Sequence, residues 1–226
     1  TVPAARQAEI TRWPRYGEEE KKAVLAMLES NRFYQEIPLL EQELKDHLKV
    51  PYVKAHCNGT SALISAFFAL DLPRGSEIMA PSYTAWATTA PLHLFGYVPV
   101  FIDINPRAMT FDLEHAKRRL TPATRALVPM HSFGNPCDMD QICAFAKEHG
   151  LLVVEDAAQA QGASLKGIPM GAWGAIGCYS FQSSKILPAI EGGAGVYQSR
   201  EHYERATMFG NYELPSSFPA DSPYRT

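Results

Sequence analysis

The sequence predicts an α/β protein of three layers (α/β/α), in which helices cover both faces of a mostly parallel sheet. From residue 52 to residue 156, short apolar runs of strand length alternate with amphipathic stretches of helical period. This alternation is typical of parallel strands joined by helical crossovers. The 226 residues are 46% hydrophobic and 20% charged, a composition that supplies a full core for a globular fold.

Two helices are expected ahead of the first strand. Residues 17–30 place Val24 and Leu28 at helical spacing, behind glutamates in the first turn that interact favourably with the helix dipole. Residues 38–50 repeat the helical period with leucines at every fourth position. Both segments are therefore assigned to an N-terminal helical part of the chain.

Strands and helices are then expected in turn. The expected strands are residues 52–57, 77–82, 98–103, 125–131, 151–156 and 194–199. The expected helices are residues 61–70, 85–95, 113–120 and 138–150. From about residue 210 the sequence is polar and rich in proline, which predicts a loop. Ligands of such sheets bind beyond the carboxyl ends of the strands, so His131, Glu155 and Asp156 are expected at the functional edge.

Composition argues against several classes of function. The formal net charge of -3 gives no overall attraction to nucleic acid or to an anionic membrane. Four cysteines without a CxxC pair, and the lack of an HExxH segment, indicate neither a disulfide framework nor a metal site. There is no signal peptide and no apolar run long enough to cross a bilayer. We therefore expect a cytoplasmic protein that binds no metal, nucleic acid or membrane.

One lysine has unusual neighbours. The segment "CYSFQSSKILPAIEGG", residues 178–193, surrounds Lys185 with hydroxyls, aromatics and apolar side chains, and no acidic residue is next to it. Most lysines are solvated and chemically silent. A lysine among groups that cannot pair with its charge favours the neutral amine, which is a nucleophile toward carbonyl compounds. Lys185 is therefore a candidate for covalent chemistry if the chain also binds a carbonyl cofactor.

The segment "NGTSALISAFFAL" predicts a phosphate seat. Asn58 and Gly59 form a turn, and Thr60 and Ser61 stand at the start of a helix. Free backbone N–H groups, two hydroxyls and the positive end of the helix dipole attract a phosphate. The alternative is a plain helix N-cap without a ligand. A Walker lysine and a GxGxxG segment are both missing, so a nucleotide site lacks its usual support.

Two further features, a carboxylate at the end of a strand and a pair of glycines, belong with the lysine and the phosphate seat. Asp156 ends a buried strand, "LLVVED", and such a carboxylate needs a partner, either a helix N-terminus or the protonated ring nitrogen of a ligand. Gln159 is placed to hydrogen-bond a phenolic oxygen on that ring. Ser180 precedes the lysine, and Gly192 and Gly193 allow close approach of the backbone. Phosphate seat, carboxylate and amine together are the groups that pyridoxal phosphate requires.

Taken in order, these segments resemble the DegT/DnrJ/EryC1/StrS family of pyridoxal-phosphate aminotransferases of fold type I, which aminate keto sugars and cyclitols. The resemblance runs through "NGTSAL", "VVEDAAQAQGA" and "SFQSSKILPAIEGGAGV" and covers nearly the whole chain. It implies that residues 1–226 form the family's large cofactor-binding domain with an N-terminal helical segment. It also implies that the family's smaller C-terminal domain is absent from this chain.

The resemblance implies roles for individual residues. Lys185 stands where the family has the lysine that forms a Schiff base with the cofactor, Asp156 where it has the partner of the pyridine nitrogen, and Gln159 where it has the contact to the phenolic oxygen. The implied phosphate seat consists of Gly59, Thr60, Ser61 and Ser180.

The sequence departs from the family pattern at two of these places. The residue after the threonine of "PSYT", where the family has an aromatic stacked on the cofactor ring, is Ala85, and we expect Trp86 to take over the stacking. Ile190 stands where the family has a glycine before the "EGG" run.

The implied reaction moves an amino group from glutamate or glutamine to a keto sugar, favoured to be nucleotide-linked, or to a keto cyclitol. A lysine rather than a histidine at residue 185 favours transamination over the dehydration that some members of the group perform. The family also implies a homodimer with a shared active site. Two alternatives stay open: an enzyme that makes an aminated aromatic precursor, and a non-catalytic relative that serves sensing or assembly.

Overall fold

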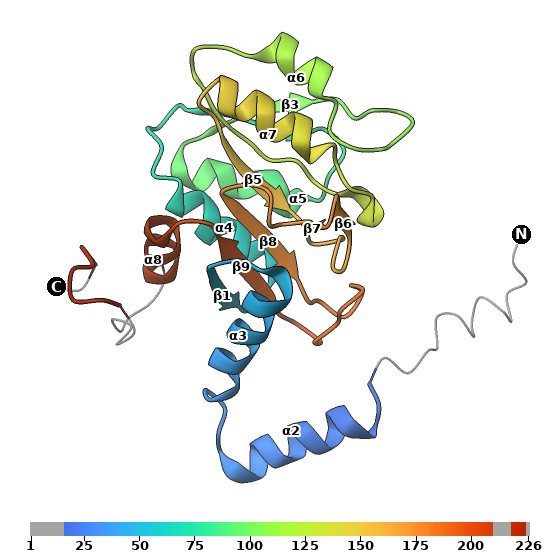
Figure 1. Ribbon diagram of the computed structural model, residues 1–226, viewed down its shortest axis with the longest axis vertical. Helices are drawn as coiled ribbons and strands as arrows, with labels where there is room; N and C mark the ends of the chain where they lie inside the picture. Colours follow the sequence, from blue (N-terminus) through green and yellow to red (C-terminus); the bar gives the residue numbers. More distant parts are fainter. Residues whose placement is uncertain (1–15, 210–217, 225–226) are drawn as a thin grey trace, which may run out of the picture. The chain divides into compact units, whose positions relative to one another are not determined.

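The structure is a computed structural model that describes residues 16–209 and 218–224 (Figure 1). The chain divides into two compact units, Thr1–Leu40 and Glu41–Thr226. Most of the loop expected from about residue 210 lies outside the described residues. Both predicted N-terminal helices are present, as α2 (Glu18–Ser30) and α3 (Glu36–Leu48). Helix α2 begins where the Glu20 carboxylate accepts the Gly17 N–H at 2.6 Å, and none of its residues is buried.

A sheet of seven strands organises the larger unit. Strand β9 pairs antiparallel with both of its neighbours, whereas the other pairs in the sheet are parallel. The predicted, mostly parallel sheet is thus confirmed. The spatial order is β1 (Tyr52–His56), β9 (Gly193–Tyr197), β8 (Ile176–Ser180), β5 (Leu152–Asp156), β4 (Thr124–Leu127), β2 (Glu77–Pro81) and β3 (Val98–Ile102).

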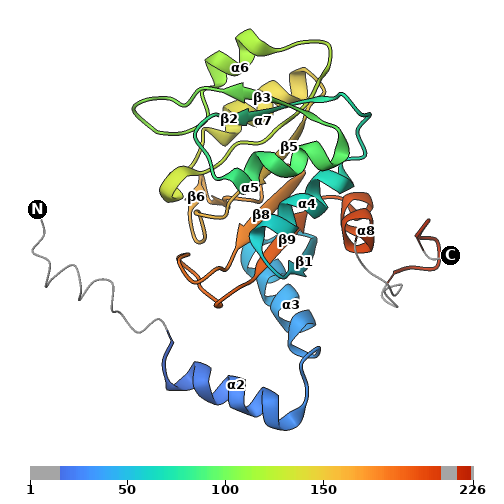
Figure 2. The same cartoon turned by 180° about the vertical axis from the view of Figure 1, so that it is seen from behind.

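Helices join these strands and cover both faces of the sheet. They are α4 (Gly59–Ala69), α5 (Trp86–Thr89), η1 (Ala90–Phe95), α6 (Leu113–Arg119), η2 (Ser132–Gly134), α7 (Met139–Glu148) and α8 (Arg200–Met208). A small hairpin, β6 (Ser164–Leu165) and β7 (Ile168–Pro169), follows β5. Helix α7 lies in front of the sheet in Figure 1, and α4, with α8 beside it, lies on the face that is turned to the front in Figure 2.

Side-chain alternation along the strands produces two separate cores. On β2, Met79 packs in the core that contains Ile142 of α7, whereas its neighbour Ile78 packs in the core that contains Phe67 of α4. The same parity holds on β5 for Val153 and Val154. Successive residues of a strand point to opposite faces, so these two cores are the two interfaces of a three-layer α/β/α fold, as predicted.

Two of the expected elements differ clearly in extent, and β8 and α8 were not among the expected elements. The helix expected over residues 85–95 is split into α5 and the 3-10 helix η1, because Pro91 lacks the N–H that an α-helix would use at that point. The strand expected to reach residue 131 ends at Leu127. Beyond it the chain stays extended and keeps one bridge to the sheet, between Met130 and Asp156.

Candidate active site

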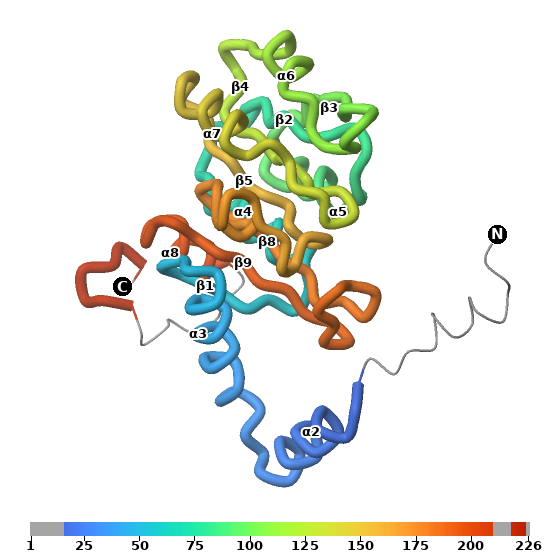
Figure 3. Tube along the Cα trace, turned by 45° about the vertical axis from the view of Figure 1, so that its right-hand side comes forward, coloured from blue at the N-terminus to red at the C-terminus, as the bar shows by residue number. Residues whose placement is uncertain are grey.

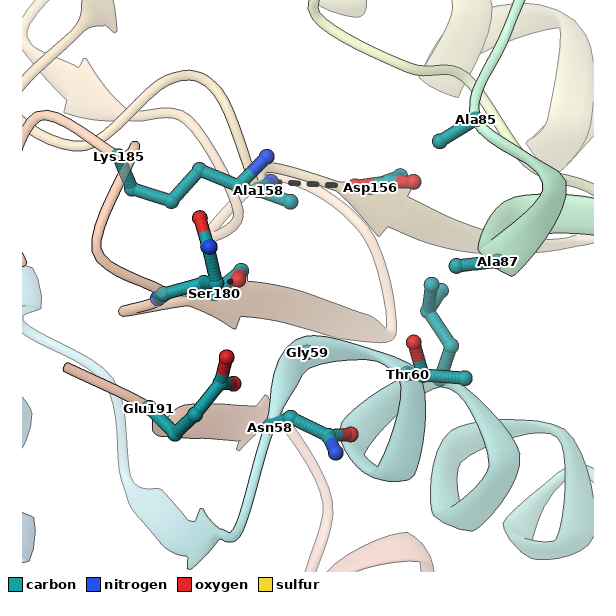
Figure 4. A pocket seen from close by; sticks show the side chains of 12 residues that line it. Asn58, Gly59, Thr60, Ala85, Ala87, Asp156, Ala158, Ser180, Lys185 and Glu191 are labelled. Atoms are coloured by element: carbon teal, nitrogen blue, oxygen red, sulfur yellow. Dashed lines mark hydrogen bonds between the residues drawn. The ribbon is translucent and has the colours of Figure 1, made fainter.

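A cavity of about 300 Å³ opens at the carboxyl edge of β5 and β8, beside the N-terminus of α4 (Figure 4). Topology explains this location, since α4, β5 and β8 all bring polar termini to the same edge. Its lining consists of Asn58, Gly59, Thr60, Leu63, Ala85, Ala87, Asp156, Ala158, Ser180, Gln182, Lys185 and Glu191. Sequence positions more than a hundred residues apart therefore meet around one space, as the sequence predicted for the lysine, the carboxylate and the helix start.

Close backbone packing forms the floor of this cavity. A Cβ atom added to Gly59 would lie 2.7 Å from the Ser180 Cβ, and one added to Gly193 would lie 2.5 Å from the Asn58 oxygen. Only glycine allows α4 to begin this near to β8 and β9. The Asn58 side chain accepts the Ser61 N–H at 2.8 Å. The remaining N–H groups of the first turn have no acceptor within the helix, which makes this end of α4 fit for a phosphate.

Asp156 presents a buried carboxylate to the cavity. It is 4% exposed, and its backbone is held by a hydrogen bond from its N–H to the Pro129 oxygen at 2.9 Å. One carboxylate oxygen accepts the Ala158 N–H at 3.1 Å and the other accepts the Thr88 hydroxyl at 2.7 Å. No ion pair among the described residues includes Asp156. A buried carboxylate that faces a cavity without a cationic partner fits a protonated ring nitrogen.

Lys185 enters the cavity from the loop between β8 and β9, which Figure 3 traces as one excursion from the sheet. The lysine is half-buried, and in Figure 4 its amine extends toward the side of the cavity where Asp156 lies. The loop is closed by hydrogen bonds from the Phe181 N–H to the Gly192 oxygen at 2.8 Å and from the Ser183 N–H to the Ile190 oxygen at 2.9 Å. Ile190 adopts a φ of 63°, a conformation that glycine accepts without strain.

The other predicted cofactor residues are distributed unequally. Thr60 and Ser180 line the cavity, whereas Ser61, Trp86 and Gln159 are not among its lining residues. The Ser61 hydroxyl lies 3.1 Å from the Cys57 sulfur, and the Gln159 oxygen accepts the Phe133 N–H at 2.7 Å. Trp86 is 84% exposed, so the cavity wall beside it consists of its neighbours Ala85 and Ala87. Contacts of Trp86, Gln159 and Ser61 with a cofactor stay predictions.

Sequence reasoning missed three polar residues at the site. Gln182 and Glu191 line the cavity, and Thr88 hydrogen-bonds the Asp156 carboxylate from α5. Lys185 has no acidic neighbour in sequence, yet the loop folds back and brings Glu191 to the same space. The repeat of threonine at residues 84 and 88, four apart at the start of an expected helix, is the signal that could have indicated Thr88.

Comparison with known proteins places this fold in a family. Residues 14–220 match the sequence model of the DegT/DnrJ/EryC1/StrS aminotransferase family. The chain belongs to this family.

Individual members show how far the similarity extends. The chain is 38% identical over 166 residues to the UDP-N-acetyl-3-dehydro-alpha-D-glucosamine 3-aminotransferase of Acidithiobacillus ferrooxidans. The aligned segment covers 74% of this chain and 45% of that protein. It is 29% identical over 210 residues to the 3-amino-5-hydroxybenzoate synthase of Amycolatopsis mediterranei, covering 91% of this chain and 54% of that protein. The chain spans about half the length of these relatives.

A solved structure of the same kind agrees with the fold. The aminotransferase from Psychrobacter cryohalolentis superposes with a TM-score of 0.83 at 35% identity, covering 86% of this chain and 51% of that one. Within the described ranges, no group of three or more histidine, cysteine, aspartate or glutamate side chains could hold a metal ion. The helices described are all too short or too polar to cross a membrane.

Proposed function

We propose that this DegT/DnrJ/EryC1/StrS chain is the large cofactor-binding domain, residues 1–226, of a pyridoxal-phosphate aminotransferase. The observation that carries the proposal is the meeting of Lys185, Asp156 and the N-terminus of α4 around one cavity. An amine, a carboxylate and a phosphate seat are the groups that bind the aldehyde, the ring nitrogen and the phosphate of this cofactor. Relatives across the family support the same cofactor.

Each residue has a defined task in the proposed site. Gly59, Thr60 and Ser180 would hold the phosphate, Asp156 the ring nitrogen, and Lys185 the aldehyde carbon by a covalent bond. When bound, pyridoxal phosphate supplies an electron sink for negative charge that forms on the substrate carbon. The amine of Lys185 would take the proton from that carbon as general base and deliver it, as general acid, to the former aldehyde carbon of the cofactor. Donor and acceptor would use the same site in turn, so ping-pong kinetics are expected.

We propose glutamate or glutamine as the donor and a keto sugar, favoured to be nucleotide-linked, or a keto cyclitol as the acceptor. The support comes from the relatives, among them the UDP-sugar 3-aminotransferase described above and an L-glutamine:2-deoxy-scyllo-inosose aminotransferase of Streptomyces kanamyceticus. Lys185 favours transamination over dehydration. Similarity over 91% of the chain to 3-amino-5-hydroxybenzoate synthase keeps an aromatic precursor as a second candidate product.

We further propose a cytoplasmic homodimer with an active site shared between subunits. All four cysteines are free thiols, which suits a reducing compartment. Apolar side chains next in sequence to the cavity lining are exposed: Trp86 by 84%, Ile186 by 70% and Leu187 by 54%. Exposed apolar groups of this size mark interaction surfaces, and a second copy would cover them. Sedimentation of the protein tests this assembly, and a purely monomeric species would contradict it.

The experiment that tests the function combines spectroscopy with mapping. The protein is mixed with pyridoxal phosphate, its visible absorption is recorded, the adduct is reduced with borohydride, and the labelled peptide is identified by mass spectrometry. We expect a visible band that reduction fixes on Lys185 and that excess glutamate bleaches.

Two variants make the result specific. Lys185→Ala is expected to lose the band and all turnover, whereas Lys166→Ala removes an exposed lysine paired with Asp140 and is expected to behave as wild type. A label scattered over surface lysines would contradict the proposal. A different result would support the sensing or assembly alternative: the wild-type protein shows no turnover, and Lys185→Ala still binds a partner protein.

A further inference from the structure

A chain of hydroxyls reaches the carboxylate of Asp156 from outside the cavity. Thr88 on α5 is fully buried, and its hydroxyl lies 2.7 Å from one carboxylate oxygen of Asp156. The Thr84 hydroxyl, four residues earlier and ahead of the first residue of α5, lies 2.6 Å from the Thr88 hydroxyl. Thr84 is half-buried, so the chain runs from the edge of the protein to the base of the site. Neither threonine lines the cavity.

The direction of these hydrogen bonds follows from proton counting. A hydroxyl has one proton to donate and can also accept. An ionised carboxylate only accepts, so Thr88 gives its proton to Asp156. The oxygen of Thr88 must then accept from Thr84. The arrangement is therefore a one-way relay, Thr84 to Thr88 to Asp156, that ends on a negative charge.

The Asp156 carboxylate keeps hydrogen-bonding capacity for a further partner. Its two oxygens offer about four lone-pair sites, of which Thr88 takes one and the Ala158 N–H takes another. Asp156 also lines the cavity, so its remaining sites are available to a group inside it. Two fixed donors hold the plane of the carboxylate in one orientation. In this orientation the remaining lone pairs can accept the proton of a ring nitrogen inside the cavity.

We infer that Thr88, itself oriented by Thr84, is a positioning residue that holds the Asp156 carboxylate in the orientation that accepts the proton of the ring nitrogen of bound pyridoxal phosphate. This inference rests on the proposed function. Helix α5 would then have two roles. Ala87 forms part of the cavity wall, and Thr88 orients Asp156. Thr88 acts through Asp156 and does not touch the cofactor.

A structural role for the same hydroxyls makes a different prediction. If the pair served only to tie α5 to β5, its loss would lower the stability of the protein and leave the protonation of the ring unchanged. The deciding readout is therefore the protonation state, which ¹⁵N NMR reports when the protein is loaded with ring-labelled [¹⁵N]pyridoxal phosphate. The rate of the half-reaction with glutamate is measured beside it.

Three variants test the relay. Thr88→Val removes the hydroxyl and keeps the shape, Thr88→Ser keeps the hydroxyl, and Thr84→Val removes only the outer link. We expect the ¹⁵N resonance of Thr88→Val to move toward that of an unprotonated ring. Its half-reaction should slow by about tenfold, the worth of one hydrogen bond to a charged group, while the KM for glutamate changes by less than about threefold. Thr88→Ser should restore both values, and Thr84→Val should shift both in the same direction by less.

Every outcome decides the inference. A Thr88→Val protein with a protonated ring and a wild-type half-reaction overturns it, and leaves the proposed function intact. If Thr88→Val does not fold, Thr84→Val decides, and an unchanged resonance there overturns the relay. A wild-type protein that does not bind pyridoxal phosphate through Lys185 overturns the proposed function itself, and the inference with it.

Discussion

Two adjacent carboxylates at the end of β5, Glu155 and Asp156, are both buried but have opposite surroundings. Glu155 is fully buried and accepts N–H groups from Gly171, Trp173 and Gly174 at 2.6–2.8 Å. It also lies 3.1 Å from the Nε2 of His131. Asp156 has two donors and an open cavity in front of it.

The difference separates a carboxylate whose partners are all protein groups from one that has capacity left for a ligand. Glu155 has filled its hydrogen-bonding capacity with protein groups, and the Nδ1 of its partner His131 accepts the Cys137 N–H at 3.1 Å. That network closes the turn before β8 on one face of the sheet. Asp156 points to the opposite face, where capacity remains. Burial alone therefore does not identify a site, whereas unfilled capacity next to a cavity does.

The largest effect is expected from Asp156→Asn. The amide cannot hold a positive charge on the ring nitrogen, and loss of one partner of a buried ion pair costs enough to slow turnover by at least about a hundredfold. Stability of the protein without cofactor should change little. Single-turnover rates and thermal unfolding check both statements, and an unaltered rate would remove Asp156 from the mechanism.

Glu155→Gln should show the opposite pattern. Its NH₂ group would face N–H donors that have no other acceptor, which we expect to lower the free energy of unfolding by about 3 kcal/mol. Denaturant unfolding measures this loss. Molecules that stay folded should still attach pyridoxal phosphate at Lys185. A protein as stable as wild type would mean that the comparison between the two carboxylates is wrong.

A third group, the half-buried His56 at the end of β1, also has unfilled hydrogen-bonding capacity, but it is not among the residues that line the cavity. Its Nε2 is buried without a partner among the described residues, and burial, with the nearby charge of Lys54, lowers its pKa to about 4. The pKa is lower in the folded state than in the unfolded chain, so the stabilising contribution is present above pH 6.5 and is lost as the pH falls toward 4.

The expected cost of acidification is measurable. Between pH 7 and pH 5 this histidine should account for about 2 kcal/mol of lost stability. His56→Phe should reduce the pH dependence by that amount in denaturant unfolding at the two pH values. Equal slopes for variant and wild type would show that His56 is not buried in its neutral form.

The smallest effect concerns the backbone beside Lys185. Ile190 is a β-branched residue at a φ of 63°, where the strain of about 1–2 kcal/mol exceeds the entropy cost of glycine. Ile190→Gly should therefore stabilise the protein by about 0.5–1 kcal/mol. Ile186→Gly, in the same loop and 70% exposed, is the matched control and should be neutral or destabilising. Stabilisation by both variants would argue against local strain.

Much of the fold and the centre of the site could be predicted from sequence. Apolar period 2 and period 3.6 are strong local signals, and the rule for carboxyl ends correctly brought Asp156 to the cavity with the start of α4. The resemblance added the residue at which covalent chemistry is expected, Lys185. The fold and the position of Asp156 could be predicted because they depend on spacing along one segment or on the end of one element, whereas the covalent role of Lys185 stays a prediction.

The rest depends on contacts between segments, which spacing does not reveal. Thr88 matters through a side chain 68 residues away, and Glu191 through the fold of a loop. Trp86 is the nearest aromatic in sequence to the expected stacking position, and on the short helix α5 it is 84% exposed, so its contact with a cofactor stays a prediction. Only the three-dimensional position of the two alanines beside it shows which side of α5 faces the cavity.

The reversed strand β9 has a mechanical consequence. Because β9 runs antiparallel to β8, the residues at the two ends of the Lys185 loop, Ser180 and Gly193, are direct neighbours in the sheet. The lysine therefore lies on a loop whose two ends are held side by side in the sheet. If Lys185 holds the cofactor as proposed, an amine displaced by a substrate would stay on this loop, within a small volume around the reacting carbon. Its effective concentration there would be high.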